Sequence, residues 1–320
     1  MFKKLGVSLV VLCCGAIAAS AQTPNNPKYD LTRIGARGIG TGVNTYSAER
    51  EARLGQRMAD VVASQARLVR DPLVNEYLTN LVNRLAEYSD MPMPYTVKIV
   101  DSDQTEAYAF PGGHMFVNSG LILATEDEAQ LAGVLAHEIA HVAARHATRI
   151  KSKSFLMNLV SVPLSFAGPL AYSAGMATPI YAAKFARDAE NEADLLGLQY
   201  MYSAGYDPAE FVKLFEKLTT HQRRLWNPRV LRAMVPEPAP QDRLANATEI
   251  VSRMLPPKSD YIVSTSEYDA ARARLLELGN YQGKKGADGT RPRLRKPRVP
   301  RRDRGSEKPA TVPGQLLAHR

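Results

Sequence analysis

Cysteine is nearly absent from this chain of 320 residues. Its two cysteines, Cys13 and Cys14, both lie within residues 1–21. That stretch has two lysines, an apolar core over residues 6–18 and a small-residue cleavage site ending at Ala21, the pattern of a cleaved signal peptide. Neither cysteine follows a lipoprotein box. We therefore expect a periplasmic or secreted mature chain that has no disulfide to stabilise it.

A long apolar run is also missing. The stretch between Lys153 and Lys184 has no charged residue, but prolines and glycines interrupt it. Its proline-free pieces are shorter than the roughly 20 residues that a membrane-spanning helix needs. We expect residues 154–183 to form mobile helices that cover the functional site, and peripheral membrane contact is a further possibility for them.

Aromatic residues are missing from the end of the chain after Tyr281. Residues 281–320 contain twelve Lys or Arg and three Asp or Glu, so their net charge of +9 equals that of the whole chain. This composition predicts a disordered basic tail. Such a tail can attract anionic lipid or nucleic acid, but the lack of interleaved aromatic residues argues against nucleic acid, as does export. We expect a solvated tail or one attracted to a membrane surface.

The remaining residues are enough for one folded domain. Residues 22–44 are rich in Asn, Pro and Gly and are expected to form an extended lead-in, and residues 45–280 a mostly helical α+β domain. Ser47 is a suitable N-cap for an amphipathic helix that runs to Leu68. Asp71, followed by proline, predicts the start of a second helix.

Three short stretches predict strands of a small antiparallel sheet. Residues 95–100 alternate and are rich in β-branched side chains, and residues 107–110 and 114–118 follow, joined by the turn at 111–113. The edge of such a sheet can pair with an extended peptide, main chain to main chain. His114 could touch substrate or metal, although a single histidine on a strand more often has a surface or structural role.

The pentapeptide His137-Glu138-Ile139-Ala140-His141 lies in an apolar, proline-free stretch that predicts a buried helix. On a helix the two histidines share one face and can bind one metal ion. Glu138 would then lie beside the open coordination position, as in hydrolytic zinc sites. The alternative is a core helix with two incidental histidines, but it would leave Glu138 buried without a task, which is costly.

A third metal ligand must come from another part of the chain. The longer motif H-E-x-x-H-x-x-G-x-x-H is not completed, because Ala144 and Ala147 stand at its Gly and His positions. Glu190 and Asp194 would share a helical face, so one could bind the metal and the other could accept the second ring N–H of a ligand histidine. Glu192 would point to a different face. The alternative is a solvated acidic start of a helix.

These residues resemble a known family. The resemblance covers about residues 45–250, and its marks are Ala109–Leu121, His137–His141, Arg145-His146, Arg187, Glu190–Asp194 and Gly197. Together they are similar to the zinc metallopeptidase family that includes the HtpX heat-shock protease and the CAAX prenyl proteases.

The resemblance implies a zincin-like metallopeptidase fold and one Zn2+ ion per subunit. It implies that His137, His141 and Glu190 bind zinc, that Glu138 is the general base, and that Asp194 supports the site. We expect His146, five residues past His141 on a continuing helix, to lie off the ligand face and to have a structural role.

The chain departs from this family in one downstream segment. Where the family commonly has a His-Pro pair before Pro-x-x-Arg, this chain has Glu237 in place of the histidine, followed by Arg243. A carboxylate can also bind zinc, so we hypothesise that Glu237 can occupy the water position and hold the enzyme latent. Arg243 is expected either to stabilise the developing oxyanion or to pair with an acid.

Our first functional hypothesis is a zinc-dependent endopeptidase of the cell envelope. The resemblance implies unfolded, misfolded or misassembled polypeptides as its substrates. The alternative is a chaperone or assembly factor that uses the same groove without cleavage. Residues 244–281 are too short for several tetratricopeptide repeats of about 34 residues each, which favours the enzyme. A nucleic-acid-binding protein driven by the basic tail is the least favoured hypothesis.

Overall fold

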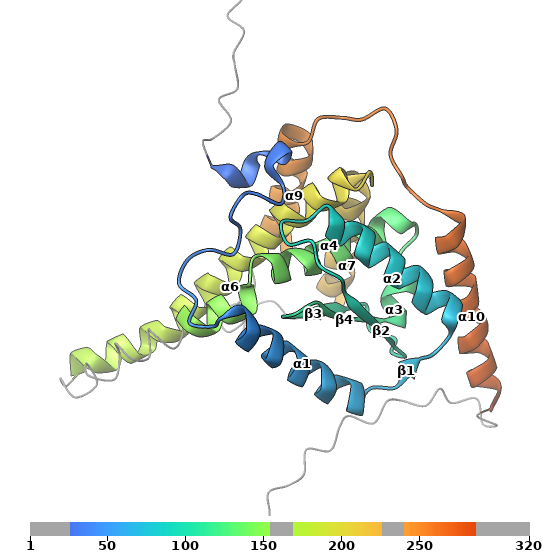
Figure 1. The fold of residues 1–320 in the computed structure, drawn as a ribbon, viewed down its shortest axis with the longest axis horizontal. Helices are drawn as coiled ribbons and strands as arrows, with labels where there is room; N and C mark the ends of the chain where they lie inside the picture. The colour runs from blue at the N-terminus through green and yellow to red at the C-terminus, as the bar shows by residue number, and fades with distance from the viewer. Residues whose placement is uncertain (1–25, 154–168, 226–239, 286–320) are drawn as a thin grey trace, which may run out of the picture. The chain divides into compact units, whose positions relative to one another are not determined.

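The computed structural model describes the backbone of residues 26–153, 169–225 and 240–285 (Figure 1). The chain divides into two compact units, Met1–Glu277 and Leu278–Arg320, and of the second only the end of a helix is described. Four of the predicted features lie wholly or largely outside the described residues: the signal peptide, most of the uncharged stretch with its side chains, Glu237, and the basic tail.

The first two predicted helices begin where their caps indicate. In α1 (Ala48–Gln65) the Ser47 side chain accepts a hydrogen bond from the backbone N–H of Arg50, and in α2 (Pro72–Glu87) Asp71 accepts one from Val74. These starts confirm the predictions. The helix α1 ends before the expected Leu68, because the chain there enters the short strand β1 (Leu68–Val69).

The sheet is mixed, with strand order β1-β2-β4-β3. The predicted strands are found as β2 (Thr96–Val100), β3 (Ala107–Phe110) and β4 (His114–Asn118). The pairing of β3 with β4 is antiparallel as expected, whereas β2 pairs with β4 in parallel and the unpredicted strand β1 pairs with β2 antiparallel. The loop over residues 101–106 takes the chain past one strand position to the edge, and β4 returns to fill the gap beside β2.

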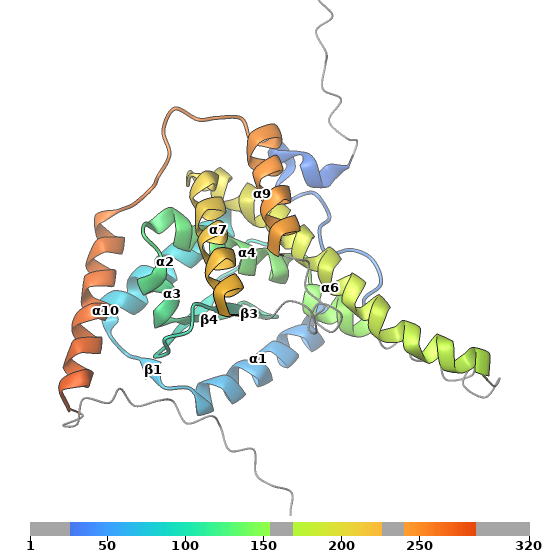
Figure 2. The same ribbon diagram turned by 180° about the vertical axis from the view of Figure 1, so that it is seen from behind.

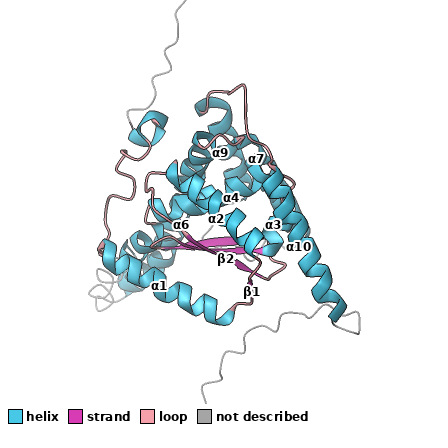
Figure 3. Ribbon diagram, turned by 45° about the vertical axis from the view of Figure 1, so that its right-hand side comes forward, coloured by secondary structure: helices cyan, strands magenta, loops and turns pink. Residues whose placement is uncertain are grey.

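Helices cover both faces of the sheet (Figure 3). On one face α1 packs through Ala59 against Val100 and Phe116. The other face belongs to the main core, which also contains α2 and α4 (Glu128–Ala143). The further helices are α3 (Ser119–Ala124), α6 (Pro169–Ser203), α7 (Pro208–Leu225), α9 (Pro240–Met254) and α10 (Ser266–Lys285).

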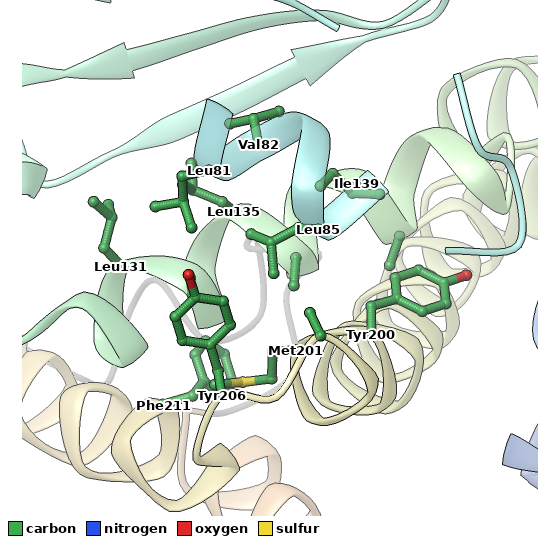
Figure 4. Close-up of a cluster of buried hydrophobic side chains, with 14 of the residues drawn as sticks. Leu81, Val82, Leu85, Leu131, Leu135, Ile139, Tyr200, Met201, Tyr206 and Phe211 are labelled. Atoms are coloured by element: carbon green, nitrogen blue, oxygen red, sulfur yellow. The ribbon is translucent and has the colours of Figure 1, made fainter. Parts of the chain in front are cut away.

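The helix α4 lies at the centre of the main core. Its apolar side chains Leu131, Leu135 and Ile139 are fully buried. They meet side chains of α2, of α6 and of the start of α7, as Figure 4 shows. Seen from behind, α7 lies over α4, and α9 packs against α7 and α6 (Figure 2). This surrounding fixes the position of the helix that carries the two motif histidines.

The residues before α1 are anchored to the domain. We call residues 26–46 the N-terminal arm; it contains the 3-10 turns η1 (Pro27–Tyr29) and η2 (Leu31–Arg33) and otherwise irregular backbone. Its Arg37 side chain is fully buried, as is Asp90, with which it forms a two-point ion pair. The arm is therefore part of the folded structure.

The described helices contain no candidate membrane span. None of them combines the length and the apolar character that crossing a bilayer requires.

Candidate metal centre

The end of α4 presents the two motif histidines to one point. Asp127 is the N-cap of helix α4 and accepts a 2.8 Å hydrogen bond from the backbone N–H of Gln130. One helical turn separates His137 and His141, and their Nε2 atoms are 3.0 Å apart. Because the rest of α4 is fixed by the core, these nitrogens are held close together by the fold.

The helix α6 approaches α4 unusually closely at this place. A Cβ added to Gly197 would lie 2.8 Å from the backbone N and Cα of His137, a distance that Cβ atoms essentially never show. Glycine is therefore required where the two helices meet. The preceding turns of α6 bring Glu190 and Asp194 beside the histidines.

Three ligand groups converge here. The Glu190 carboxylate lies 3.5 Å from Nε2 of His137 and 3.5 Å from Nε2 of His141, and one ligand atom of each residue lies within 4.8 Å of the others. Two nitrogens bound to one tetrahedral zinc at about 2.0–2.1 Å are about 3.3 Å apart. The donor set and its spacing therefore fit a zinc-like ion, and this trio could hold a metal.

Asp194 lies beside Nδ1 of His137, the ring nitrogen that faces away from the ligand trio. Its Oδ1 is 2.9 Å from Nδ1 of His137, although the two atoms are not aligned as a regular hydrogen bond. Arg243, from α9, donates to both oxygens of Asp194 at 2.7 and 2.8 Å and lies 3.1 Å from Oε2 of Glu190. Arg243 therefore pairs with acids, which is one of the two roles expected for it.

The charge state of the two carboxylates follows from these contacts. Burial by itself would raise both pKa values, but the side chains of His137 and Arg243 outweigh it. The pKa of Glu190 falls to about 2, and that of Asp194 falls well below its usual range. Both groups are thus ionised at neutral pH.

Glu138 lies between α4 and the edge strand β3. Its Oε2 accepts a 3.0 Å hydrogen bond from the backbone N–H of Ala109. Burial raises the pKa of Glu138 to about 7, even though His137 and the Ala109 N–H favour the charged form. A carboxyl group with such a pKa can take up and release a proton near neutral pH.

The structure corrects the sequence-based view of His146. The helix α4 ends at Ala143, and Arg145 has φ 56°, so the chain turns before His146. His146 Nδ1 is 2.9 Å from Nδ1 of His141, and its Nε2 is 3.1 Å from Glu192. The prediction of a continuing helix was wrong, because a non-glycine residue with positive φ leaves no clear signal in a sequence.

The remaining candidates lie apart from this cluster or outside the described residues. His114 is half-buried at the start of β4 and does not belong to the ligand trio, and burial lowers its pKa. Glu237 lies outside the described residues, so its predicted approach to the metal stays a prediction.

This chain is similar both to a protein-family model and to individual proteins. Residues 72–251 match the model of peptidase family M48. The chain is 31% identical over 283 residues to the beta-barrel assembly-enhancing protease of Yersinia pestis and 28% identical over 293 residues to that of Escherichia coli K12. These alignments cover 84% and 88% of this chain. It is also 30% identical over 150 residues to the mitochondrial metalloendopeptidase OMA1 of Schizosaccharomyces pombe, 44% of this chain and 43% of the relative.

The chain spans 56% and 59% of the length of the two assembly-enhancing relatives. The family model, in contrast, matches more than half of this chain and includes both motif histidines as well as Glu190 and Asp194 of α6. The chain therefore belongs to peptidase family M48.

Proposed function

We propose that this protein is a zinc-dependent endopeptidase of the cell envelope. One observation carries the proposal: His137, His141 and Glu190 converge with metal-ligand spacing beside the half-buried carboxyl group of Glu138. Two histidines and one carboxylate are a common ligand set of hydrolytic zinc, whereas carboxylates and carbonyls alone suit magnesium or calcium. Bound there, zinc would act as a Lewis acid and acidify a water molecule.

Glu138 supplies the proton transfers. It lies next to the ligand His137 in the chain, and the Ala109 N–H keeps its carboxylate oriented toward the edge of the sheet. With a pKa raised to about 7, Glu138 accepts a proton from the attacking water and passes it to the departing amine. Asp194 and Arg243 hold the ligand residues in place during this step.

The strand β3 suggests how substrate is held. It is the edge strand of the sheet, and the Ala109 N–H faces Glu138 rather than another strand. An extended polypeptide can add to such an edge through its main chain, largely independently of its sequence. This mode suits unfolded or misassembled polypeptides, and the name of the relatives, beta-barrel assembly-enhancing protease, is consistent with substrates of this kind in the envelope.

The test combines metal analysis with hydrolysis of casein by purified residues 22–320. We expect one zinc per chain in the wild type and in Glu138→Gln, and cleavage only in the wild type, because the amide cannot act as a base. The matched control is Glu76→Gln, which changes an exposed glutamate on α2 and should leave both readings unchanged.

Each other outcome has a definite meaning. Cleavage by Glu138→Gln at the wild-type rate would remove Glu138 from the mechanism. A wild-type protein without bound metal would overturn the metal centre. Zinc without cleavage in either protein would favour a chaperone role or a latent site, and Glu237→Ala would then distinguish the two by restoring cleavage only if the site is latent.

A further inference from the structure

We propose that His146 is a positioning residue for His141, and that the N-terminal arm takes part in the metal centre through it. A chain of contacts runs from His141 to His146, then to Glu192, and then to Lys28 of the arm. This inference rests on the proposed role of His141 as a metal ligand. It assigns a role to three residues that lie outside the ligand trio.

The contacts determine which ring nitrogens carry protons. The ionised Glu192 only accepts hydrogen bonds, so the Nε2 of His146, at 3.1 Å, is its donor. In a neutral ring the Nδ1 of His146 is then an acceptor, and it receives the Nδ1–H of His141 at 2.9 Å. The Nε2 of His141 is thereby left with its lone pair directed at Glu190 and His137, as metal binding requires.

His146 reaches this position because the chain breaks after α4. Arg145, the residue with φ 56°, donates to Glu51 of α1 at 2.5 Å and to the backbone oxygen of Tyr46 at 2.9 Å. The backbone of Gly40 lies against the end of α4, where an added Cβ would be 2.8 Å from the oxygen of Ala143. The arm and α1 therefore hold the turn that directs His146 toward His141.

Two cations contact Glu192 in addition to the neutral ring of His146. Lys28 of the arm forms an ion pair with one of its oxygens, and Arg149 lies 3.3 Å from the other. Lys28 is held near Glu192 because Arg37 donates a 2.7 Å hydrogen bond to its backbone oxygen, and Arg37 is itself paired with the buried Asp90. The N-terminal arm is thus fixed so that the Lys28 ammonium balances the charge of the Glu192 carboxylate.

This chain of contacts from His141 through His146 and Glu192 to Lys28, which we call the relay, has a measurable consequence for metal affinity. Outer partners of ligand histidines typically change metal affinity by about 10–100-fold when they are removed. We expect His146→Leu to weaken zinc binding by about this factor. His146→Asn keeps a polar group near the Nδ1 position and should recover part of the affinity, whereas His146→Gln keeps one near Nε2 and should recover little.

The experiment measures the zinc dissociation constant of residues 22–320 by competition with a chromogenic chelator. The visible spectrum of the cobalt-substituted protein reports ligand geometry independently of activity. The variants are His146→Leu, His146→Asn, His146→Gln and Glu192→Gln, with Glu76→Gln as the control for the last. A thermal unfolding scan of each metal-free variant checks that it folds, and Glu192→Gln is the decisive variant if His146→Leu does not.

The outcomes separate this inference from the proposed function. Weaker zinc binding and an altered cobalt spectrum in His146→Leu or Glu192→Gln, with partial recovery in His146→Asn, support the relay. Wild-type affinity and spectrum in every one of these two variants that folds would overturn it while leaving the metal centre intact. Absence of zinc from the wild type would instead overturn the metal centre itself, and the relay with it.

Discussion

The two motif histidines are supported in different ways. Behind His137, a carboxylate stands in direct contact, since Asp194 is 2.9 Å from its Nδ1. Behind His141, the carboxylate of Glu192 is one residue further away, and His146 lies between them. The direct partner depends on two helices that cross in the core, whereas the relayed partner depends on a turn after α4 and on the N-terminal arm. The same requirement, a fixed ring with one nitrogen free for the metal, is thus met by a direct contact at His137 and by a relayed contact at His141.

The direct side should show the largest effect when it is broken. Asp194→Ala removes the partner of His137 and leaves the buried Arg243 with Glu190 as its remaining partner among the contacts described above. Removal of one member of a buried ion pair costs about 3–5 kcal/mol, and we expect the lower end because Glu190 stays. Urea unfolding of the metal-free protein measures this loss, and chelator competition should show weaker zinc binding as well.

The comparison predicts a contrast with the relayed side. His146→Leu should lose zinc affinity but less stability than Asp194→Ala, because it leaves no buried arginine with a lost partner. Equal losses of unfolding free energy in the two variants would show that the two supports are not different in kind.

The crossing of α4 and α6 offers a second way to disturb the direct side. Gly197→Ala places a methyl group against the backbone of His137, so the helices must separate. Overpacking of this kind costs about 1–3 kcal/mol, and zinc affinity should fall because Glu190 moves away from both histidines. Thermal unfolding and chelator competition measure the two effects.

Gly279→Ala is the matched control for this change. Gly279 lies in α10, and a Cβ added there would meet no atom of the described residues within 4 Å apart from the neighbouring backbone of its own helix. Alanine is favoured over glycine in a helix by about 0.5–1 kcal/mol, so the control should be slightly more stable than the wild type. A stable, fully zinc-binding Gly197→Ala protein would contradict the close approach seen here.

The direct support of His137 was largely predictable from the sequence, and the relayed support of His141 was not. The i, i+4 spacing of Glu190 and Asp194 indicated one ligand and one supporting carboxylate, and both residues do lie beside His137. The strands β3 and β4 were predicted with their observed bounds, since alternation and the turn between them are local signals.

What escaped prediction depends on contacts between distant parts of the chain. The parallel pairing of β2 with β4 follows from where the chain crosses the sheet, not from the residues of either strand. The turn at Arg145 is held by Glu51 and Tyr46, nearly one hundred residues earlier. Arg-His has no periodicity or turn signature, so the sequence could not show that His146 meets His141.

Arg243→Lys sharpens the comparison with a smaller change. Lysine keeps the positive charge but cannot form the planar two-point contact with Asp194. We expect a loss of unfolding free energy of about 1 kcal/mol, the typical worth of one hydrogen bond, and a small loss of zinc affinity.

The cobalt spectrum of a double variant, Arg243→Lys with His146→Asn, should then show the sum of the two single changes if the supports act independently. A double variant whose spectrum differs from this sum would show that the supports of His137 and His141 are coupled.

The smallest effect is expected at the far end of the relay. Lys28→Met removes the arm's cation from Glu192 but leaves Arg149 and His146 in contact with it. The lysine side chain is 38% exposed, so solvent screens the pair, and exposed ion pairs are worth at most about 1 kcal/mol. That corresponds to a loss of zinc affinity of at most about fivefold, which chelator competition at low ionic strength can resolve. A loss as large as that of His146→Leu would show that the arm, and not the histidine, holds Glu192 in place.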